Sequence, residues 1–521
     1  MVKFMKGNEK QQNKLKIIAI PLLFIWLIIF FVLTIIPAII TFIISFQRYN
    51  PQVGISGSHF VGLHNYHLLL QELRYQPLFT DSIVLAVVPA IIAIIIAFPV
   101  AFIVGGMQAG RLRSACIGLL LLPAFVPDRM LSNLLVGMVW REVIVGDHLY
   151  TFLLITKLSI KPAAICAFVG ACAAGIYRDR GNNVALGAIS GVLIGIAVNA
   201  VRFFSGNREL IAMTPRSCFA VFIDGGFDDW IFHFGINRMQ LSAASAVWVF
   251  KTMLQFALAI ILVIIVFLCV RMRKNELISS NIVNMNTSSI RTVFAFASAL
   301  LFLLLLILPL GLRRDSAIAI LLPIASSPPS PLTEVVQNLS ITLASGVVFI
   351  ILFTMITTWC YAYFGKIAFA LILLLSPLVN NFTGEFIFYS NLSLLNNHLP
   401  VILSGIFSLS FVLPTVNLAH LKRSQVTNFG EYIRTIGPYL IAFTGVFVAN
   451  TWKGYFAQMI YASSNVRYTF FRSSTDGWRM AVGTFDSIFL ILFVLPVLFI
   501  GIGTVRIFTF IDSKAQGMTT S

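Results

Sequence analysis

Polar side chains inside long apolar stretches are the residues of this sequence that could do chemistry. A polar group in hydrocarbon costs free energy unless it is paired or lines water, so it prompts a functional hypothesis. Amide and carboxylate groups could hydrogen-bond the hydroxyls of a polar solute, and aromatic rings could stack on it. The candidates for such a solute path are Asn133, Asn199, Arg202, Glu385, Asn450, Trp452 and Tyr455.

The same residues have a structural interpretation. Polar side chains in membrane helices also form hydrogen bonds between helices, and tryptophan and tyrosine anchor helix ends at the membrane surface. For any one residue the structural interpretation is the simpler one. Glu385 has the strongest claim to a function, because a single carboxylate at a membrane edge needs a partner.

The sequence shows no sign of an enzyme. It contains no GxxxxGK[ST] loop for nucleotide phosphates, no HExxH pair and no paired catalytic carboxylates. Its six cysteines form no CxxC pair or Cys/His cluster with metal-ligand spacing, so we expect no metal site and no cofactor in this chain. The sequence has no basic stripe with interleaved aromatic residues, so we do not expect nucleic acid as a partner.

The composition places these residues in a membrane protein. Of the 521 residues, 58% are hydrophobic and only 11% are charged, whereas soluble proteins carry roughly 25% charged residues. A soluble globule could not bury this much apolar surface, so we expect the lipid bilayer to solvate it. The net charge is +17. We expect the basic residues that cause it to lie at helix ends, beside anionic lipid headgroups.

About twelve apolar segments are long enough to cross a membrane, for which roughly 20 residues are needed. The sequence therefore predicts an all-α, polytopic transmembrane bundle. The predicted segments are 17–46, 82–107, 115–140, 162–177, 184–204, 244–270, 291–312, 337–364, 367–382, 398–418, 433–459 and 480–511.

The segments fall into two groups of six around a polar stretch. We expect a cytoplasmic tail at 1–16, a first half at 17–274, a linker at 275–290, a second half at 291–511 and a tail at 512–521. The basic residues predict that both termini are cytoplasmic in a multi-pass protein of the cell membrane. The loop residues that set this orientation are Arg111, Arg113, Arg178, Arg180, Arg271, Arg273, Lys274, Lys366, Lys422 and Arg423.

The order of motifs in the first half resembles a known transporter family. Segment 60–66 reads FVGLHNY, a basic turn follows at Arg111 and Arg113, and segment 121–127 reads LLPAFVP before Trp140. These elements resemble the first permease subunit of carbohydrate-type ABC importers, the maltose-transporter-like family. In the second half, QNLS at 337–340, AYF at 362–364, LLNNHLPVIL at 394–403 and WKGYF at 452–456 resemble the partner subunit.

The resemblance implies two permease halves fused in one chain. It implies transport of a carbohydrate or similar polar solute, with ATP bound by a separate pair of ATPase subunits and the solute delivered by an extracytoplasmic binding protein.

One element of the family is missing. Each family half carries an EAA loop whose short helices dock on the ATPase. Here only short remnants occupy these positions, and about ten residues are too few for two helices. The remnants are Arg178, Asp179, Arg180 and Gly181 in the first half, and Lys422, Arg423, Gly430 and Glu431 in the second. The alternative is therefore a degenerate, permease-like scaffold that assembles other membrane or surface proteins without ATP-driven transport.

An acidic cluster between the fifth and sixth segments has two interpretations. Asp224, Asp228 and Asp229 lie where the family has a loop outside the membrane. We expect a solvated loop, and the alternative is contact with the binding protein or with a cation.

Overall fold

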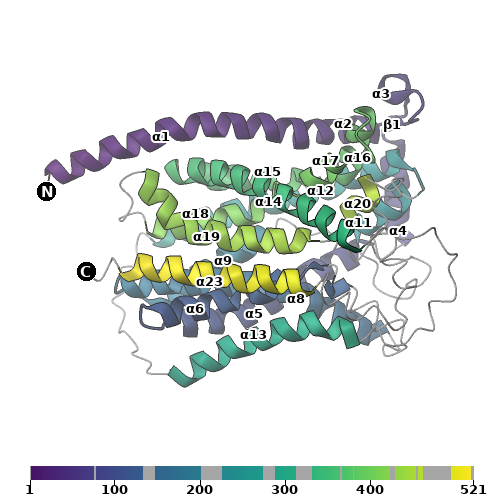
Figure 1. Ribbon diagram of the computed structural model, residues 1–521. Helices are drawn as coiled ribbons and strands as arrows, with labels where there is room; N and C mark the ends of the chain where they lie inside the picture. Colours follow the sequence, from purple (N-terminus) through teal and green to yellow (C-terminus); the bar gives the residue numbers. More distant parts are fainter. Residues whose placement is uncertain are drawn as a thin grey trace.

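A computed structural model shows a bundle of helices (Figure 1). It describes residues 2–75, 78–128, 130–132, 147–200, 226–236, 238–273, 288–311, 331–363, 366–379, 381–422, 429–452, 456–461 and 494–517. Within these residues the two strands are β1 (Gln47–Arg48) and β2 (His59–Phe60), which pair antiparallel. The remaining elements are helical, which confirms the predicted all-α class.

The elements of the first half follow one another from the N-terminus. They are α1 (Val2–Phe30), η1 (Phe31–Ile35), α2 (Ile36–Ser45), α3 (Gly54–Gly57), α4 (His64–Tyr75), α5 (Leu78–Gly105), α6 (Arg111–Leu120), η2 (Leu122–Phe125), α8 (Asp147–Asp179), α9 (Val184–Ala200), α11 (Phe227–Trp230), η4 (Ile231–Ile236) and α12 (Leu241–Arg273).

The second half begins with α13, three residues before the predicted start at Arg291. Its elements are α13 (Ser288–Gly311), α14 (Pro331–Ala362), α15 (Lys366–Leu375), η6 (Ser376–Leu378), α16 (Phe382–Asn391), α17 (His398–Leu403), η7 (Leu409–Phe411), α18 (Val412–Leu421), α19 (Phe429–Thr451), α20 (Phe456–Tyr461) and α23 (Leu495–Gly517). Residues 274–287, which hold most of the predicted linker, lie outside the described part of the chain.

Seven helices of the described residues are long and apolar enough to cross a membrane, and an eighth candidate is bent. The first of the seven is Lys16–Ser45, close to the predicted 17–46, because an uninterrupted apolar run determines both ends. The bent candidate joins the Ala370–Leu378 part of α15 and η6 to α16 at 64°. The chain is thus a polytopic bundle, and the predicted number of twelve spans stays a prediction.

Three predicted segments differ from the helices observed. Segment 115–140 is interrupted after α6, where Val126 is extended, and segment 398–418 is divided between α17 and α18. The third difference is in α8. The sequence predicts a span beginning at Pro162, but α8 begins at Asp147 and contains Pro162 in its interior. Membrane helices tolerate an internal proline because neighbouring helices satisfy the freed backbone groups. The longer helix brings Lys157 and Lys161 into the bundle.

One pair of elements has a matching form in the two halves. α6 and α15 each lead into a 3-10 turn with proline near its start, at Pro123 and at Pro377.

Several helices pack on the opposite half. α1 lies against α14, and Trp26 and Phe30 make edge contacts with Phe407. α13 lies against α6 and η2, where the Ser298 hydroxyl donates to the Leu119 carbonyl at 2.6 Å. α12 contacts α15, and α23 contacts α6. Figure 1 shows α1 and α13 along opposite sides of the bundle. This exchange interlocks the halves.

Small residues let α5, α8 and α9 approach closely. Gly187, Gly191 and Gly195 are spaced four apart on α9. A Cβ atom added to Gly191 would lie 2.7 Å from the Cα of Gly170 on α8, and one added to Gly170 would lie 2.7 Å from the Cβ of Ala101 on α5. Such spacing is a means of packing helices in lipid, where burial from water supplies no driving force.

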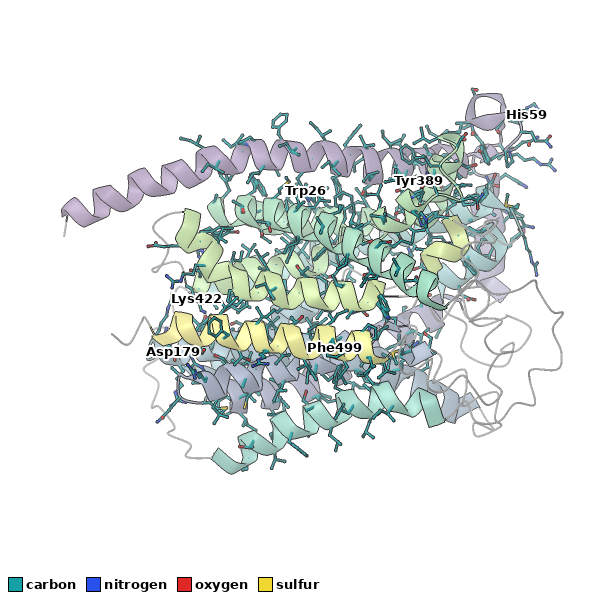
Figure 2. The ribbon with its side chains drawn as sticks, viewed as in Figure 1. Trp26, His59, Asp179, Tyr389, Lys422 and Phe499 are labelled. Carbon is teal, nitrogen blue, oxygen red and sulfur yellow. The ribbon has the colours of Figure 1, made fainter. Side chains whose placement is uncertain are left out.

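Aromatic side chains fill the boundary between the halves, which we call the seam. Phe168 of α8 contacts Phe443 of α19 and Phe508 of α23 with ring centroids 5.7 and 5.3 Å apart. All three rings are buried. Figure 2 shows side chains occupying the space between the helices along the bundle.

The two ends of the bundle are called the terminal face and the distal face. The terminal face is the end at which the N-terminus of α1 and the C-terminal end of α23 lie, and the distal face is the end at which α3 and β1 lie (Figure 1). Asp179 and Lys422 lie toward the terminal face and His59 lies at the distal face (Figure 2).

Candidate functional site

A polar cluster crosses the seam toward the distal face. We call it the seam site; it consists of Asp128, Ser132, Lys157, Lys161 and Asn450. The Lys161 ammonium lies 2.8 Å from the Asp128 carboxylate and also donates a hydrogen bond to the Asn450 side-chain oxygen. Lys161 and Asp128 belong to the first half and Asn450 to the second, so this lysine joins the halves directly.

The two lysines of the seam site share one face of α8. Lys157 precedes Lys161 by four residues, which is about one helical turn. Its ammonium donates to the Ser132 hydroxyl at 2.8 Å, and that hydroxyl donates to the Asp128 carbonyl at 2.8 Å. Lys157 is buried, whereas Lys161 is 15% and Asp128 38% exposed. The Lys161 end is therefore the more exposed part of the cluster.

The turn after α6 explains why a polar cluster can form here. The helix changes to 3-10 geometry at Leu122, just before Pro123, and the backbone then becomes extended at Val126. Asn450 satisfies a backbone group near this break, because its amide nitrogen donates to the Ala124 carbonyl at 3.1 Å as well as to the Val446 carbonyl at 2.7 Å. Irregular backbone at membrane depth needs such partners.

Only part of the predicted solute path meets at this site. Asn450 is a member, and Trp452 lies two residues on with its ring buried. Glu385 lies elsewhere, on α16, where it accepts a hydrogen bond from the Tyr461 hydroxyl at 2.5 Å. Asn199 lies on α9, one residue before that helix ends. Asn133, Arg202 and Tyr455 lie outside the described residues.

Sequence reasoning missed Asp128, Lys157 and Lys161. Placing the helix start at Pro162 left both lysines in a loop, where charged residues need no explanation. A signal was present: two lysines four residues apart, followed by an apolar run through Pro162, fit a helix with one polar face.

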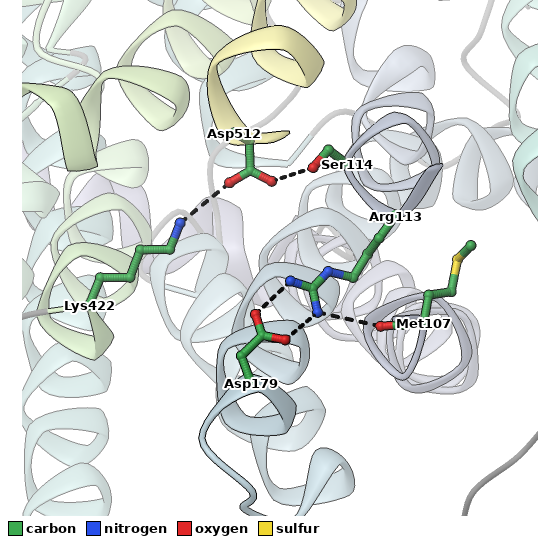
Figure 3. A network of polar contacts seen from close by, with 6 residues as sticks. All are labelled: Met107, Arg113, Ser114, Asp179, Lys422 and Asp512. Atoms are coloured by element: carbon green, nitrogen blue, oxygen red, sulfur yellow. Dashed lines mark hydrogen bonds and ion pairs between the residues drawn. The ribbon is translucent and has the colours of Figure 1, made fainter. Parts of the chain in front are cut away.

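A second polar network lies near the terminal face, where Figure 2 labels Asp179 and Lys422, and Figure 3 shows it from close by. We call it the terminal clasp; it consists of Arg113, Ser114, Asp179, Lys422 and Asp512. The Arg113 guanidinium binds both Asp179 carboxylate oxygens, at 2.7 and 2.6 Å, and also donates to the Met107 carbonyl at 3.4 Å. This pairing joins α6 to the end of α8 within the first half, in the two-bond geometry that arginine favours with carboxylates.

The other part of the terminal clasp joins the halves. The Ser114 hydroxyl of α6 donates to one Asp512 oxygen at 2.7 Å, and the Lys422 ammonium lies 3.3 Å from the other (Figure 3). Burial disfavours the charge on Lys422, but Tyr439 and Asp512 more than offset this effect and raise the pKa of Lys422 above the ordinary lysine value. Asp512 thus binds partners from both halves.

The predicted loop remnant of the first half is a helix cap. Gly181 has a φ of +71° and its N–H donates to the Arg178 carbonyl, while the Asn182 N–H donates to the Tyr177 carbonyl. These two bonds form a Schellman motif, for which glycine is the preferred residue. The Asn183 side chain then accepts from the Ala185 N–H at the start of α9. Arg180 to Asn183 are fully used in ending one helix and starting the next.

The remnant of the second half is similarly short. Lys422 follows α18 directly and takes part in the terminal clasp. Gly430 and Glu431 lie in the first turn of α19, where a carboxylate interacts favourably with the helix dipole. Arg423 lies outside the described residues.

The acidic cluster before α12 is not a solvated loop, and that expectation is wrong. Asp228 and Asp229 of α11 are buried, and the Asp228 carboxylate lies 2.5 Å from the Lys251 ammonium of α12. The Asp228 and Lys251 side chains are 1% and 2% exposed, and we call these two residues the distal pair. Burying a charge is costly unless it is paired, and Lys251 supplies the pairing. Asp224 lies outside the described residues.

In the described part of the chain, no group of three or more histidine, cysteine, aspartate or glutamate side chains could hold a metal ion. No protein-family model, curated protein or solved structure matches this chain.

Proposed function

We propose that this chain is the membrane-spanning permease of a binding-protein-dependent ABC importer for a carbohydrate or similar polar solute. The observation that carries the proposal is the seam site, where Lys161 of one half bonds Asn450 of the other. The matching proline turns after α6 and α15 and the helices exchanged between the halves support it, because many transporters are built from two similar halves with the solute site where they meet.

The geometry suggests how the seam site would act. Separation of the halves at the distal face would break the Lys161–Asn450 hydrogen bond but leave Lys161 beside Asp128 on its own half. Lys161, Asp128 and Asn450 would then present donors and acceptors to a solute with several hydroxyl groups. The buried ring contacts of Phe168 would keep the path closed nearer the terminal face.

The proposal includes partners and an orientation. Both termini would be cytoplasmic in the cell membrane, so the terminal face would meet a separate pair of ATPase subunits. The distal face would meet an extracytoplasmic solute-binding protein. ATP would bind only the ATPase subunits.

Uptake measurements test this function. Cells with and without the gene should differ in accumulation of radiolabelled mono- and oligosaccharides, and the difference should disappear on depletion of ATP. Equal accumulation across a broad carbohydrate panel, with the chain shown to be in the membrane, would contradict transport of this solute class.

A specific observation favours a second function, a scaffold for other membrane or surface proteins. The Schellman motif at Gly181 and the cap at Asn183 leave no residues between α8 and α9 for helices that dock on an ATPase. Copurification in mild detergent separates the two functions. A bound ATPase pair supports the permease, whereas recovery of other membrane proteins without an ATPase supports the scaffold.

A further inference from the structure

We infer that a groove between α2 and α12 binds an acyl chain of a membrane phospholipid. The groove has a volume of about 360 Å³, which is within the usual range of small-molecule sites. Ala38, Ile39 and Phe42 form one wall, Trp248 and Thr252 form the other, and Leu378 of η6 closes one side.

The groove is elongated along the helices. Its lining extends from Ile35 to Phe42 on one wall and from Trp248 to Phe256 on the other. With a rise of 1.5 Å per residue, each wall is about 10 to 12 Å long. Both walls belong to candidate membrane spans, so the groove runs across the bilayer as lipid chains do. This shape fits an extended hydrocarbon chain better than a compact solute.

The mouth of the groove continues the lipid-facing surface. Ile39, Phe42 and Met253 are 47%, 49% and 60% exposed. They extend the exposed apolar side chains of the same two spans, such as Phe31 and Ile261. Because the protein is a membrane bundle, a lipid chain reaches this mouth without leaving the bilayer.

Thr252 supplies the one side-chain hydroxyl of the lining. The hydroxyl oxygen is buried and has no hydrogen-bond partner among the described residues. An acyl chain would not provide one, whereas a ligand with an oxygen at this depth would. Replacing Thr252 with valine keeps the shape of the side chain and removes the hydroxyl, so this change distinguishes an apolar occupant from a polar one.

The position of the groove gives the bound chain a role. α2 and α12 belong to the first half and Leu378 to the second, so the chain would fill a gap where the halves meet. It would therefore act as a structural lipid of the bundle.

Trp248 reports occupancy of the groove, because bromine atoms on lipid chains quench tryptophan fluorescence on contact. The purified chain and its Trp248→Phe variant are reconstituted in phosphatidylcholine vesicles with and without brominated acyl chains. Trp248 is only 3% exposed, so bromine reaches it mainly through the groove. We expect the wild type to lose a larger fraction of its fluorescence than the variant. Equal fractional losses would overturn the inference.

Three further variants make the test specific to the groove. Ala38→Leu, which fills it, should reduce the fractional quenching to the level of Trp248→Phe or below, because Trp248 then adds fluorescence that bromine does not quench. Ala297→Leu, the same change at an exposed position of α13, should leave quenching unchanged. Thr252→Val should preserve or increase quenching. Unchanged quenching in folded Ala38→Leu would contradict binding in the groove. Reduced quenching in Thr252→Val would contradict an apolar occupant and indicate instead a ligand that carries a polar oxygen.

Discussion

The distal pair and the terminal clasp bury charge in different ways. In the distal pair, Asp228 and Lys251 are both almost fully buried and each is the other's ion-pair partner. In the terminal clasp, Arg113 is 2% exposed but its partner Asp179 is 40% exposed, and Asp512 has both Ser114 and Lys422 as partners. The distal pair therefore keeps both of its charges away from solvent, whereas the Asp179 carboxylate of the clasp is partly open to it.

The largest effect is expected at the distal pair. Asp228→Ala should destabilise the chain by about 3–5 kcal/mol, because it leaves the Lys251 charge buried without its carboxylate. Thermal unfolding in detergent measures the loss.

A double variant provides the control for the distal pair. Asp228→Ala with Lys251→Met should recover most of the stability, since removal of both charges removes the cost of burying them. If the double variant is no more stable than Asp228→Ala, the ion pair is not the source of the effect.

Removing a carboxylate charge from the terminal clasp should lower the stability by less than Asp228→Ala does. Asp179→Asn removes a charged acceptor from Arg113, and hydrogen bonds to charged groups contribute about 1.5–3 kcal/mol. Because Asp179 is partly exposed and water can replace it, we expect the lower end of that range. Arg180→Gln, in the same turn, is the control with little change. A loss of stability as large as that of Asp228→Ala would show that the exposure of the carboxylate does not decide how much each pair contributes.

The seam site has intermediate exposure and tests function rather than stability. Lys161→Met should reduce solute uptake by about tenfold, equivalent to roughly 1.4 kcal/mol, because the lysine would contact the solute. Ser159→Ala on the same helix is the control, since that hydroxyl bonds the Ile155 carbonyl of its own helix. Unchanged uptake in Lys161→Met, with normal amounts in the membrane, would exclude Lys161 from the solute path.

The smallest effect is expected at the shared carboxylate of the clasp. Ser114→Ala should destabilise the chain by about 1 kcal/mol, the usual net contribution of one hydrogen bond, since Lys422 still pairs with Asp512. Ser190→Ala on α9 is the control, because its hydroxyl bonds the nearby Gly187 carbonyl. An effect above that of Asp179→Asn would contradict this expectation, because the remaining contact with Lys422 would then fail to hold Asp512 in place.

Features that depend on local composition, such as the ends of an apolar span, were predicted from the sequence. The span at Lys16–Ser45 was predicted within one residue at each end, because hydrocarbon solvation depends only on a continuous apolar run. The pairing of Asp179 with Arg113, 66 positions away, and of Asp512 with Ser114, 398 positions away, was not predicted. These contacts depend on how helices pack, and charge alone does not identify the partners.

Two errors have physical causes. Pro162 was interpreted as the start of a helix because proline disrupts helices in water, whereas the bundle accommodates it inside α8. The aspartates before α12 were assigned to a solvated loop because three acidic residues in seven positions usually face water. The charge of buried Asp228 is compensated by Lys251, which is 23 positions away and lies in the next long helix.

The exchange of helices between the halves determines when this chain can complete its fold. α1 emerges first, but its packing partner α14 begins at Pro331, about 300 residues later. At a synthesis rate of about 5–20 residues per second, α1 waits roughly 15–60 s before that surface exists. During this interval it has only lipid and the nascent first half as neighbours. Assembly therefore ends late, and a chain interrupted before α14 would leave α1 exposed to membrane quality control.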